Sequence, residues 1–249
     1  IHYMERLSAA ELQYRLEQMF SFEIPAFLLS RDLRPRTVFL DMCNRRGVPV
    51  LQSSKSTDEV ISRVILFLAG EFSPYTMVHG TAVDCYGVGC LIVGAAGIGK
   101  SETALDLVER GHLLVADDMV TLHKDRDDAL YAESAPIIEH HMEIRGVGII
   151  DVKGVFGVGR VRNRKRIGLV VELEEWKQEA HYDRTGLTDE FVTILGVKIP
   201  YLLIPVRPGR NIAVILEVAA LNHRLKELGI HPAQRLNQKL IDIMTDKAL

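Results

Sequence analysis

The chain has 249 residues, of which 47% are hydrophobic and 25% charged, and its 33 acidic and 30 basic side chains give a formal net charge of -3. This composition is typical of a soluble globular protein and excludes a generally polycationic nucleic-acid binder. No apolar stretch approaches the roughly 18 residues of a membrane-spanning helix. The three cysteines cannot all pair with one another and none has C-x-x-C spacing, so neither a disulfide scaffold nor a zinc module is predicted. We therefore expect a cytoplasmic protein.

Helical and strand patterns alternate over the first part of the chain. Residues 1–20 are predicted as a helix, 25–30 as a strand, 34–47 as a helix that ends at a glycine, 48–54 as a strand and 57–70 as a helix. This small βαβ arrangement has no catalytic spacing and is typical of a regulatory or assembly module. Turn residues at 70–75 predict a domain boundary, with an N-terminal α/β domain over 1–71 and a second domain over 72–249. We expect the natural start of the first domain to lie upstream of Ile1.

Short β-rich runs begin the second domain, at 76–86 and 89–97. A helix at 101–111 and a buried strand at 112–118 follow, and the strand ends in two carboxylates. A polar loop or hairpin is predicted at 123–134, and a glycine-rich stretch covers 143–162. Further strands are predicted at 168–176, 193–206 and 211–220, before a long amphipathic helix over 220–245. The pattern favours an α/β fold.

The sharpest signal in the chain is a G-x-x-x-x-G-K-S motif, which follows an apolar run and opens a helix. Glycines let consecutive backbone N–H groups turn toward a phosphate chain, and the helix N-terminus adds the positive end of its dipole. The lysine reaches the β and γ phosphates and the serine offers its hydroxyl to Mg²⁺. A glycine turn with a surface lysine is the alternative interpretation. The predicted phosphate-binding residues are Gly94, Ala95, Ala96, Gly97, Ile98, Gly99, Lys100 and Ser101.

Two further clusters can carry chemistry. Asp117 and Asp118 follow soon after Lys100, so a tight strand-helix-strand unit places an acid beside the phosphates. A carboxylate there can accept a proton from a hydroxyl nucleophile or hold a metal, although a helix cap or turn pair is the alternative. Glu143, within the glycine-rich stretch, can complete a Mg²⁺ shell built mainly of water and phosphate oxygen. A glycine-rich hairpin with no role in catalysis explains these glycines almost as well.

These motifs together resemble one family, bacterial HPr kinase/phosphorylase, which modifies a serine of the phosphocarrier protein HPr of the sugar phosphotransferase system. The resemblance extends from Met77 to Asn211 and rests on VHGTAVDCYGVGCLIVG, GAAGIGKSETALDLVERGH, LVADD, EIRGVGIIDV, YDRTG and PVRPGRN in the expected order. It implies a P-loop kinase domain like that of phosphoenolpyruvate carboxykinase, preceded by a small α/β N-terminal domain. It also implies a homohexamer.

The resemblance assigns roles to individual residues. Its active-site positions fall on His79, Lys100, Asp117 and Arg184, and its magnesium-associated positions on Ser101 and Glu143. It implies that Asp117 takes the proton from the HPr serine when ATP or pyrophosphate is the donor. In the reverse direction, as the resemblance implies, inorganic phosphate attacks the phosphorus of phosphoserine and forms pyrophosphate. Asp117 returns the proton to the serine oxygen. The segment tied mainly to dephosphorylation is Pro205, Val206, Arg207, Pro208, Gly209 and Arg210.

The resulting hypothesis is a Mg²⁺-dependent protein serine kinase and phosphorylase that acts on HPr and regulates carbon metabolism, with no nucleic-acid or membrane partner. Two alternatives are a P-loop kinase for a small molecule and a nucleotide-gated binding module that does no catalysis. Five basic residues between positions 160 and 166 lie outside the family pattern, and we interpret them as a solvated loop, with contacts to phosphate or an acidic partner as the alternative.

Overall fold

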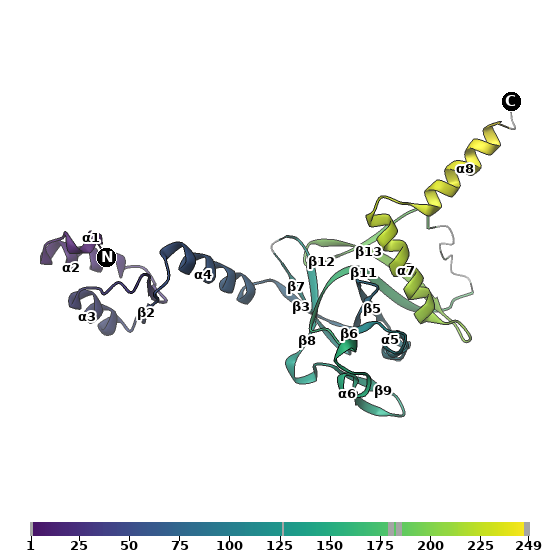
Figure 1. The fold of residues 1–249 in the computed structure, drawn as a ribbon, viewed down its shortest axis with the longest axis horizontal. Helices are drawn as coiled ribbons and strands as arrows, with labels where there is room; N and C mark the ends of the chain where they lie inside the picture. Colours follow the sequence, from purple (N-terminus) through teal and green to yellow (C-terminus); the bar gives the residue numbers. More distant parts are fainter. Residues whose placement is uncertain (1, 126, 179–181, 183–185, 247–249) are drawn as a thin grey trace. The chain divides into compact units, whose positions relative to one another are not determined.

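The structure is a computed structural model that describes residues 2–125, 127–178, 182 and 186–246. The chain divides into two compact units, Ile1–Phe72 and Ser73–Leu249 (Figure 1). Each unit has its own hydrophobic core. Strands and helices occur in both, which confirms the predicted mixed α/β class.

The first unit consists of helices around a short parallel pair of strands. In chain order its elements are α1 (His2–Glu5), α2 (Ala9–Met19), β1 (Phe27–Leu29), α3 (Thr37–Arg46), β2 (Val50–Gln52) and α4 (Thr57–Glu71). Ser8 and Glu11 form a capping box at the start of α2, which divides the predicted single N-terminal helix in two. Leu12 and Leu16 of α2 pack with Phe39 and Cys43 of α3. This core is small, and none of its residues bears a catalytic group.

The second unit is built on a mixed sheet in the order β3-β7-β8-β11-β5-β4-β6, with β13 paired to β11 and β12 paired to β13. Its strands are β3 (Tyr75–His79), β4 (Thr81–Cys85), β5 (Val88–Gly94), β6 (Leu113–Ala116), β7 (Met119–Lys124), β8 (Leu130–Ser134), β11 (Arg164–Glu175), β12 (Glu190–Ile194) and β13 (Val197–Val206). The start of β11 is antiparallel to β8, and its remainder is parallel to β5 and β13. One long strand thus joins the two parts of the sheet.

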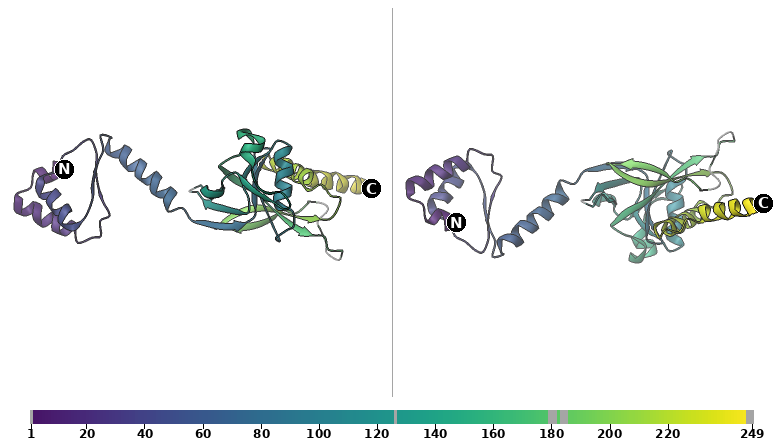
Figure 2. Two further views of the ribbon diagram at one scale, coloured as in Figure 1. Left: turned by 90° about the horizontal axis from the view of Figure 1, so that it is seen from below. Right: turned by 90° about the horizontal axis from the view of Figure 1, so that it is seen from above.

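Two helices cover one face of this sheet. Leu107 and Val108 of α5 (Lys100–Glu109) and Leu216 of α7 (Ile212–Glu227) share a core with Ile92 and Val171 of the strands. Figure 2 shows both helices on the same side of the strands. Alternate strand residues face the other way, because side chains alternate across a sheet, and pack against β7 and β8. The central strands β4, β5 and β11 are therefore covered on both faces.

A hairpin lies next to α5. Its strands are β9 (His141–Ile144) and β10 (Gly148–Asp151), and α6 (Val152–Phe156) follows directly. Met142, Ile144 and Val152 join the same core as α5, and Figure 1 shows α6 and β9 on the side of α5. The remaining short elements are the 3-10 turns η1 (Pro136–Ile138) and η2 (Val158–Arg160). The hairpin is thereby fixed close to the start of α5.

Two sequence predictions were wrong. Residues 211–220 form the start of α7 and not a strand, because Asn211 Oδ1 accepts a hydrogen bond from the Val214 amide and caps a helix. Buried residues at 212, 213, 216 and 220 then follow helical spacing. The basic run is not simply a solvated loop, since β11 begins at Arg164 and Lys165 is only 14% exposed. The final helix, α8 (Pro232–Asp246), is separate from α7 and extends away from the sheet (Figure 2).

Candidate active site

The glycine-rich motif connects the end of β5 to the start of α5. Gly94 has φ of 143° and a Cβ there would lie 2.4 Å from the Leu173 carbonyl oxygen, so no other residue fits without moving β11. Gly99 caps α5 in the left-handed region with φ of 100°. The free N–H groups at the start of α5 and the helix dipole together favour an anion at this point. The local backbone therefore has the form expected of a phosphate-binding loop, and residues 94–101 are referred to by that name.

Lys100 is held back against this loop. The side chain is only 6% exposed, and Nζ donates hydrogen bonds to the carbonyl oxygens of Gly94 (3.2 Å) and Ala95 (3.1 Å). A surface lysine would be largely exposed, so the alternative of a simple glycine turn is not what the structure shows. The two carbonyl contacts hold the Lys100 side chain inside the loop.

Asp117 follows β6 and is 3% exposed. Its Oδ1 accepts hydrogen bonds from the hydroxyls of Thr81 (2.6 Å) and Ser101 (3.0 Å). Its Oδ2 is buried and makes no hydrogen bond of ordinary geometry within the described part of the chain. Burial raises the pKa of Asp117, and the hydroxyls of Thr81 and Ser101 and the neighbouring backbone amides offset only part of that rise. The carboxylate is therefore suited to exchange a proton.

Asp118 lies in a different environment from Asp117. It is more than half exposed, and its Oδ1 is 3.1 Å from Nδ1 of His79. Its backbone is left-handed, with φ of 64°, and its carbonyl oxygen accepts a hydrogen bond from the Gly80 amide. This turn joins β6 to β7, and the hydrogen bond to Gly80 brings it beside His79 at the end of β3. A carboxylate beside His79 fixes the orientation of the imidazole.

A cavity of about 170 Å³ lies in front of the phosphate-binding loop. The titratable and hydroxyl side chains around it are His79, Thr81, Lys100, Ser101, Glu102, Asp117, Asp118, Glu143 and Arg145. Five of the residues predicted from sequence, His79, Lys100, Ser101, Asp117 and Glu143, thus line one cavity. Ala96, Gly97 and Gly99 line it as well.

Three polar residues around this cavity, Thr81, Glu102 and Arg145, were not predicted as site residues. Thr81 gives Asp117 its shortest hydrogen bond. The guanidinium of Arg145 lies against the loop, with Nη1 3.0 Å from where a Cβ on Gly97 would be. Arg145 therefore brings a second positive charge to the loop, and its place in the glycine-rich motif EIRGVGIIDV was its signal in the sequence.

Oxygen ligands that Mg²⁺ prefers surround the same cavity. The Ser101 hydroxyl, the Glu143 carboxylate and the unpartnered Oδ2 of Asp117 are of this kind. Mg²⁺ usually keeps several waters and needs only one or two protein carboxylates besides substrate phosphates. The described residues contain no cluster of three or more His, Cys, Asp or Glu side chains suited to a metal. The residues around the cavity fit a Mg²⁺ ion held largely by water and phosphate.

The segment after β13 lies at the same edge of the sheet. It turns tightly, because the Arg210 amide bonds the Arg207 carbonyl oxygen (3.2 Å) and Arg210 Nη1 bonds the Pro205 carbonyl oxygen (2.9 Å). The guanidinium of Arg207 lies 5.0 Å from the centre of the Trp176 ring. None of the segment lines the cavity at the loop. Arg184, the remaining predicted position, lies outside the described residues.

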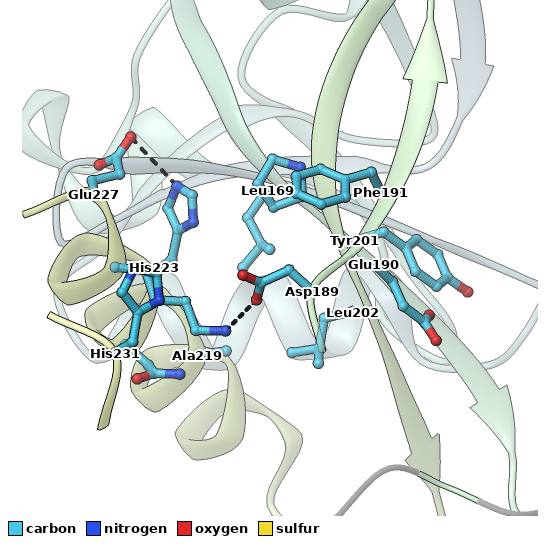
Figure 3. Close-up of a pocket in the computed structure, with 13 residues that line it drawn as sticks. Leu169, Asp189, Glu190, Phe191, Tyr201, Leu202, Ala219, His223, Glu227 and His231 are labelled. Carbon is cyan, nitrogen blue, oxygen red and sulfur yellow. Dashed lines mark hydrogen bonds and ion pairs between the residues drawn. The ribbon is translucent and has the colours of Figure 1, made fainter. Parts of the chain in front are cut away.

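A separate cavity of about 300 Å³ lies between α7 and the strands β12 and β13 (Figure 3). Figure 3 shows His223 beside Glu227. Lys226 and Asp189, which also line the cavity, form an ion pair (2.5 Å). Burial is the main cause that lowers the pKa of His223. No residue of the phosphate-binding loop lines this cavity, so it is distinct from the site at the loop.

Among the described helices, none has the length and apolar character needed to cross a membrane.

Comparison with known proteins gives matches along both units. The family model described as HPr Serine kinase N terminus matches residues 1–68, and that described as HPr Serine kinase C-terminal domain matches residues 70–240. The chain is 46% identical to the HPr kinase/phosphorylase of Thermoanaerobacter sp. over 239 residues, which are 96% of this chain and 78% of that protein. It is also 46% identical to that of Bacillus subtilis over 246 residues, which are 99% of this chain and 79% of that protein.

A solved structure gives the same result. The Hpr(Ser) kinase/phosphatase from Coxiella burnetii matches with a TM-score of 0.58 and 35% sequence identity, covering 62% of this chain and 93% of that chain. The sequence matches extend over both units, and the fold match covers more than half of the chain. The chain therefore belongs to the HPr kinase/phosphorylase family.

Proposed function

We propose that this protein is a Mg²⁺-dependent serine kinase that phosphorylates HPr with ATP or pyrophosphate, and that it removes the phosphate by phosphorolysis. The observation that carries the proposal is Asp117, a buried carboxylate with a raised pKa beside a phosphate-binding loop. The names of the relatives support the same activity. A carboxyl with a raised pKa can accept a proton in one direction and return it in the other, so one residue serves both directions.

In the phosphorylating direction Asp117 acts as the base. The serine Oγ–H of HPr gives its proton to Asp117 as the oxygen attacks the terminal phosphorus of ATP. The new O–P bond forms while the bond between that phosphorus and the leaving ADP oxygen breaks. Lys100 and Arg145 neutralise the charge on the transferring group, because both lie at the loop. Mg²⁺, when bound near Ser101 and Glu143, supplies further positive charge to the phosphate oxygens.

In the reverse direction Asp117 acts as the acid. An oxygen of inorganic phosphate attacks the phosphorus of phosphoserine, and a P–O–P bond forms as the bond to serine Oγ breaks. Asp117 returns its proton to that Oγ, so free serine and pyrophosphate are the products. We propose that His79, paired with Asp118, and Arg184 assist at the same phosphate groups, and that residues 205–210 serve mainly this direction. We also propose that the protein works in the cytoplasm as a homohexamer.

The test is to incubate the purified protein with Mg²⁺, ATP and HPr, to measure the mass of HPr, and then to add inorganic phosphate and assay pyrophosphate. We expect one added phosphate, which is then lost with release of an equal amount of pyrophosphate. HPr with its acceptor serine replaced by alanine is the control and stays unmodified. Phosphate transfer to a metabolite instead of HPr would indicate a small-molecule kinase. ATP binding without any transfer would indicate a nucleotide-gated binding module, and either result would overturn the proposal.

A further inference from the structure

An aromatic and cationic stack stands at the edge of the sheet where β11 and β13 end. The rings of Trp176 and Tyr182 are stacked, with centroids 5.0 Å apart and planes 28° from parallel. The guanidinium of Arg207 lies 5.0 Å from the centre of the Trp176 ring. A cation at this distance from an indole is attracted by the ring quadrupole. Trp176 therefore contacts both Tyr182 and Arg207.

The backbone of β11 and β13 sets up this contact. Glu175 pairs with Val206 in the parallel register of the two strands, and the Trp176 amide donates a hydrogen bond to the Val206 carbonyl oxygen (2.9 Å). Trp176 and Arg207 are the next residues along each strand, so they leave the sheet side by side. The Tyr182 hydroxyl accepts a hydrogen bond from the Lys177 amide (3.1 Å), which holds Tyr182 against Trp176. Trp176 is therefore positioned by the end of β11, and Arg207 by the end of β13.

The stack shares its edge of the sheet with the phosphate-binding loop. Strands β5, β11 and β13 are parallel, and Gly94 at the start of the loop pairs with Leu173, three residues before Trp176. In open α/β sheets, ligands bind outside the carboxyl ends of the parallel strands. Arg207 therefore lies at the edge where phosphate groups are expected to bind.

The positive charge of Arg207 is available to a ligand. Arg207 is exposed, and no ion pair joins it to a carboxylate within the described part of the chain. Arg210, by contrast, already donates a hydrogen bond from Nη1 to the Pro205 carbonyl oxygen. The attraction between a guanidinium and a ring face occupies none of the N–H donors in a hydrogen bond, so the donors of Arg207 remain for a phosphate. The indole thus orients the cation without consuming the donors that an oxyanion needs.

We propose that Trp176 is a positioning residue for phosphorolysis, which holds Arg207 so that its N–H groups bind the incoming inorganic phosphate. This inference rests on the proposed function and adds a residue to it. Free inorganic phosphate is a substrate in the dephosphorylating direction alone. The loss of Trp176 therefore falls mainly on the use of inorganic phosphate, and less on the use of ATP.

Steady-state kinetics of Trp176→Leu and Trp176→Phe test the proposal. We expect the KM for inorganic phosphate to rise about two- to fivefold in Trp176→Leu, as for loss of an exposed cation–π contact, and to rise clearly more than the KM for ATP. Trp176→Phe keeps an aromatic face and recovers part of the loss. Tyr131→Leu is a matched control, because it removes the stack of Arg164 on Tyr131 (4.4 Å), which joins β8 to the antiparallel start of β11, and it leaves both KM values unchanged.

A double-mutant cycle separates positioning from a general structural role. If Trp176 acts through Arg207, then Trp176→Leu adds little to the phosphate KM of Arg207→Ala. Additive effects, an unchanged phosphate KM, or equal rises in both KM values in Trp176→Leu would each overturn the proposal. Wild-type protein without any phosphorolysis would instead overturn the proposed function itself. The two failures are therefore distinguishable.

The protein also carries its own probe, because Trp176 is its single tryptophan. Titration of the wild-type protein with inorganic phosphate is expected to change the fluorescence of Trp176 in a saturable manner. In Arg207→Ala this saturable change disappears while the tryptophan remains. A change that persists in Arg207→Ala contradicts the proposal, since the signal would then arise from phosphate bound elsewhere.

Discussion

Two buried carboxylates lie at opposite ends of β4, and their bonding partners differ in charge. Asp117 bonds Thr81 at the start of the strand, and Asp84 lies near the end of the strand. Each is 3% exposed, and each has one oxygen without a hydrogen bond in the part of the chain that the structure describes. Their partners differ. Asp84 Oδ2 lies 3.2 Å from Arg162 and 3.0 Å from Lys165, whereas Asp117 is bonded by two hydroxyls.

This difference shows how partners decide the role of a buried acid. Two cations make Asp84 half of an ion pair, and removal of one side would leave uncompensated charge in the interior. Hydroxyl groups stabilise a carboxylate less than cations do, so burial dominates at Asp117 and raises its pKa. Equal burial therefore gives a structural ion pair at one end of β4 and a carboxyl with a raised pKa at the other.

The largest expected effect comes from Asp117→Asn, which removes the exchangeable proton while keeping the shape of the side chain. We expect the rates of HPr phosphorylation and of phosphorolysis both to fall by about 10²- to 10⁴-fold, as for loss of a general acid-base group. Asp118→Asn is the matched control, because Asp118 is exposed and contacts His79. It is expected to lose far less activity. A kinase rate in Asp117→Asn close to that of the wild type would remove Asp117 from the chemistry.

The stability of Asp117→Asn provides an internal check. Because folding raises the pKa of this carboxyl, the stability that it contributes is present below its unfolded pKa and is lost as the pH rises through the folded pKa. Near neutral pH the ionised form is therefore unfavourable to folding. Asp117→Asn is expected to have a Tm no lower than that of the wild type in a thermal melt, so its inactivity would not reflect unfolding. A clearly lower Tm would show that the ionised carboxylate stabilises the fold.

The opposite result is expected at Asp84. Asp84→Ala leaves Arg162 and Lys165 without their partner, and we expect a loss of about 3 kcal/mol in the free energy of unfolding, measured by urea denaturation. Activity of the folded fraction should be retained. The double variant Asp84→Leu with Lys165→Met removes charge from both sides and is expected to lose less. If Asp84→Ala is as stable as the wild type, the ion pair is not what holds this end of β4.

A smaller change is expected from Thr81→Val, which keeps the volume of the side chain and removes the shortest hydrogen bond to Asp117. That hydrogen bond lowers the pKa of Asp117, so its loss moves the pKa further up. The midpoint of the kinase pH profile should move to higher pH, and the rate below that midpoint should fall by roughly two- to tenfold, as for one hydrogen bond to a charged group. Thr81→Ser restores the hydroxyl and should restore the wild-type profile. A midpoint that moves to lower pH contradicts the assignment.

Local patterns in the sequence were enough for the phosphate-binding loop. The motif dictates its own backbone, because glycine φ values and the start of a helix are properties of a few adjacent residues. The position of Asp117 also followed from short spacing, since β6 comes directly after α5 and pairs with β4. Features that depend only on residues close together in the chain could therefore be predicted.

The rest depended on tertiary contacts. Arg145 reaches the loop only because Met142 and Ile144 pack its hairpin into the core beside α5, and nothing near Arg145 in the sequence indicates Gly97 as its neighbour. Lys165 looked like part of a solvated basic run because its partner, Asp84, lies on a distant strand. The apolar run 211–220 was compatible with either a strand or a buried helix. The hydrogen bond to Asn211 that caps α7 shows that it is a helix.

The most direct test of the central claim is the pH dependence of the two directions, measured on one preparation with the same substrates. If Asp117 is base in one direction and acid in the other, phosphorylation of HPr rises with pH and phosphorolysis falls with pH through midpoints above the ordinary value for an aspartate. Asp117→Glu should shift both midpoints together, whereas ionisations of the substrates would stay in place. Rates that change in the same direction with pH, or midpoints that do not move in Asp117→Glu, would contradict the claim that one buried carboxylate serves both reactions.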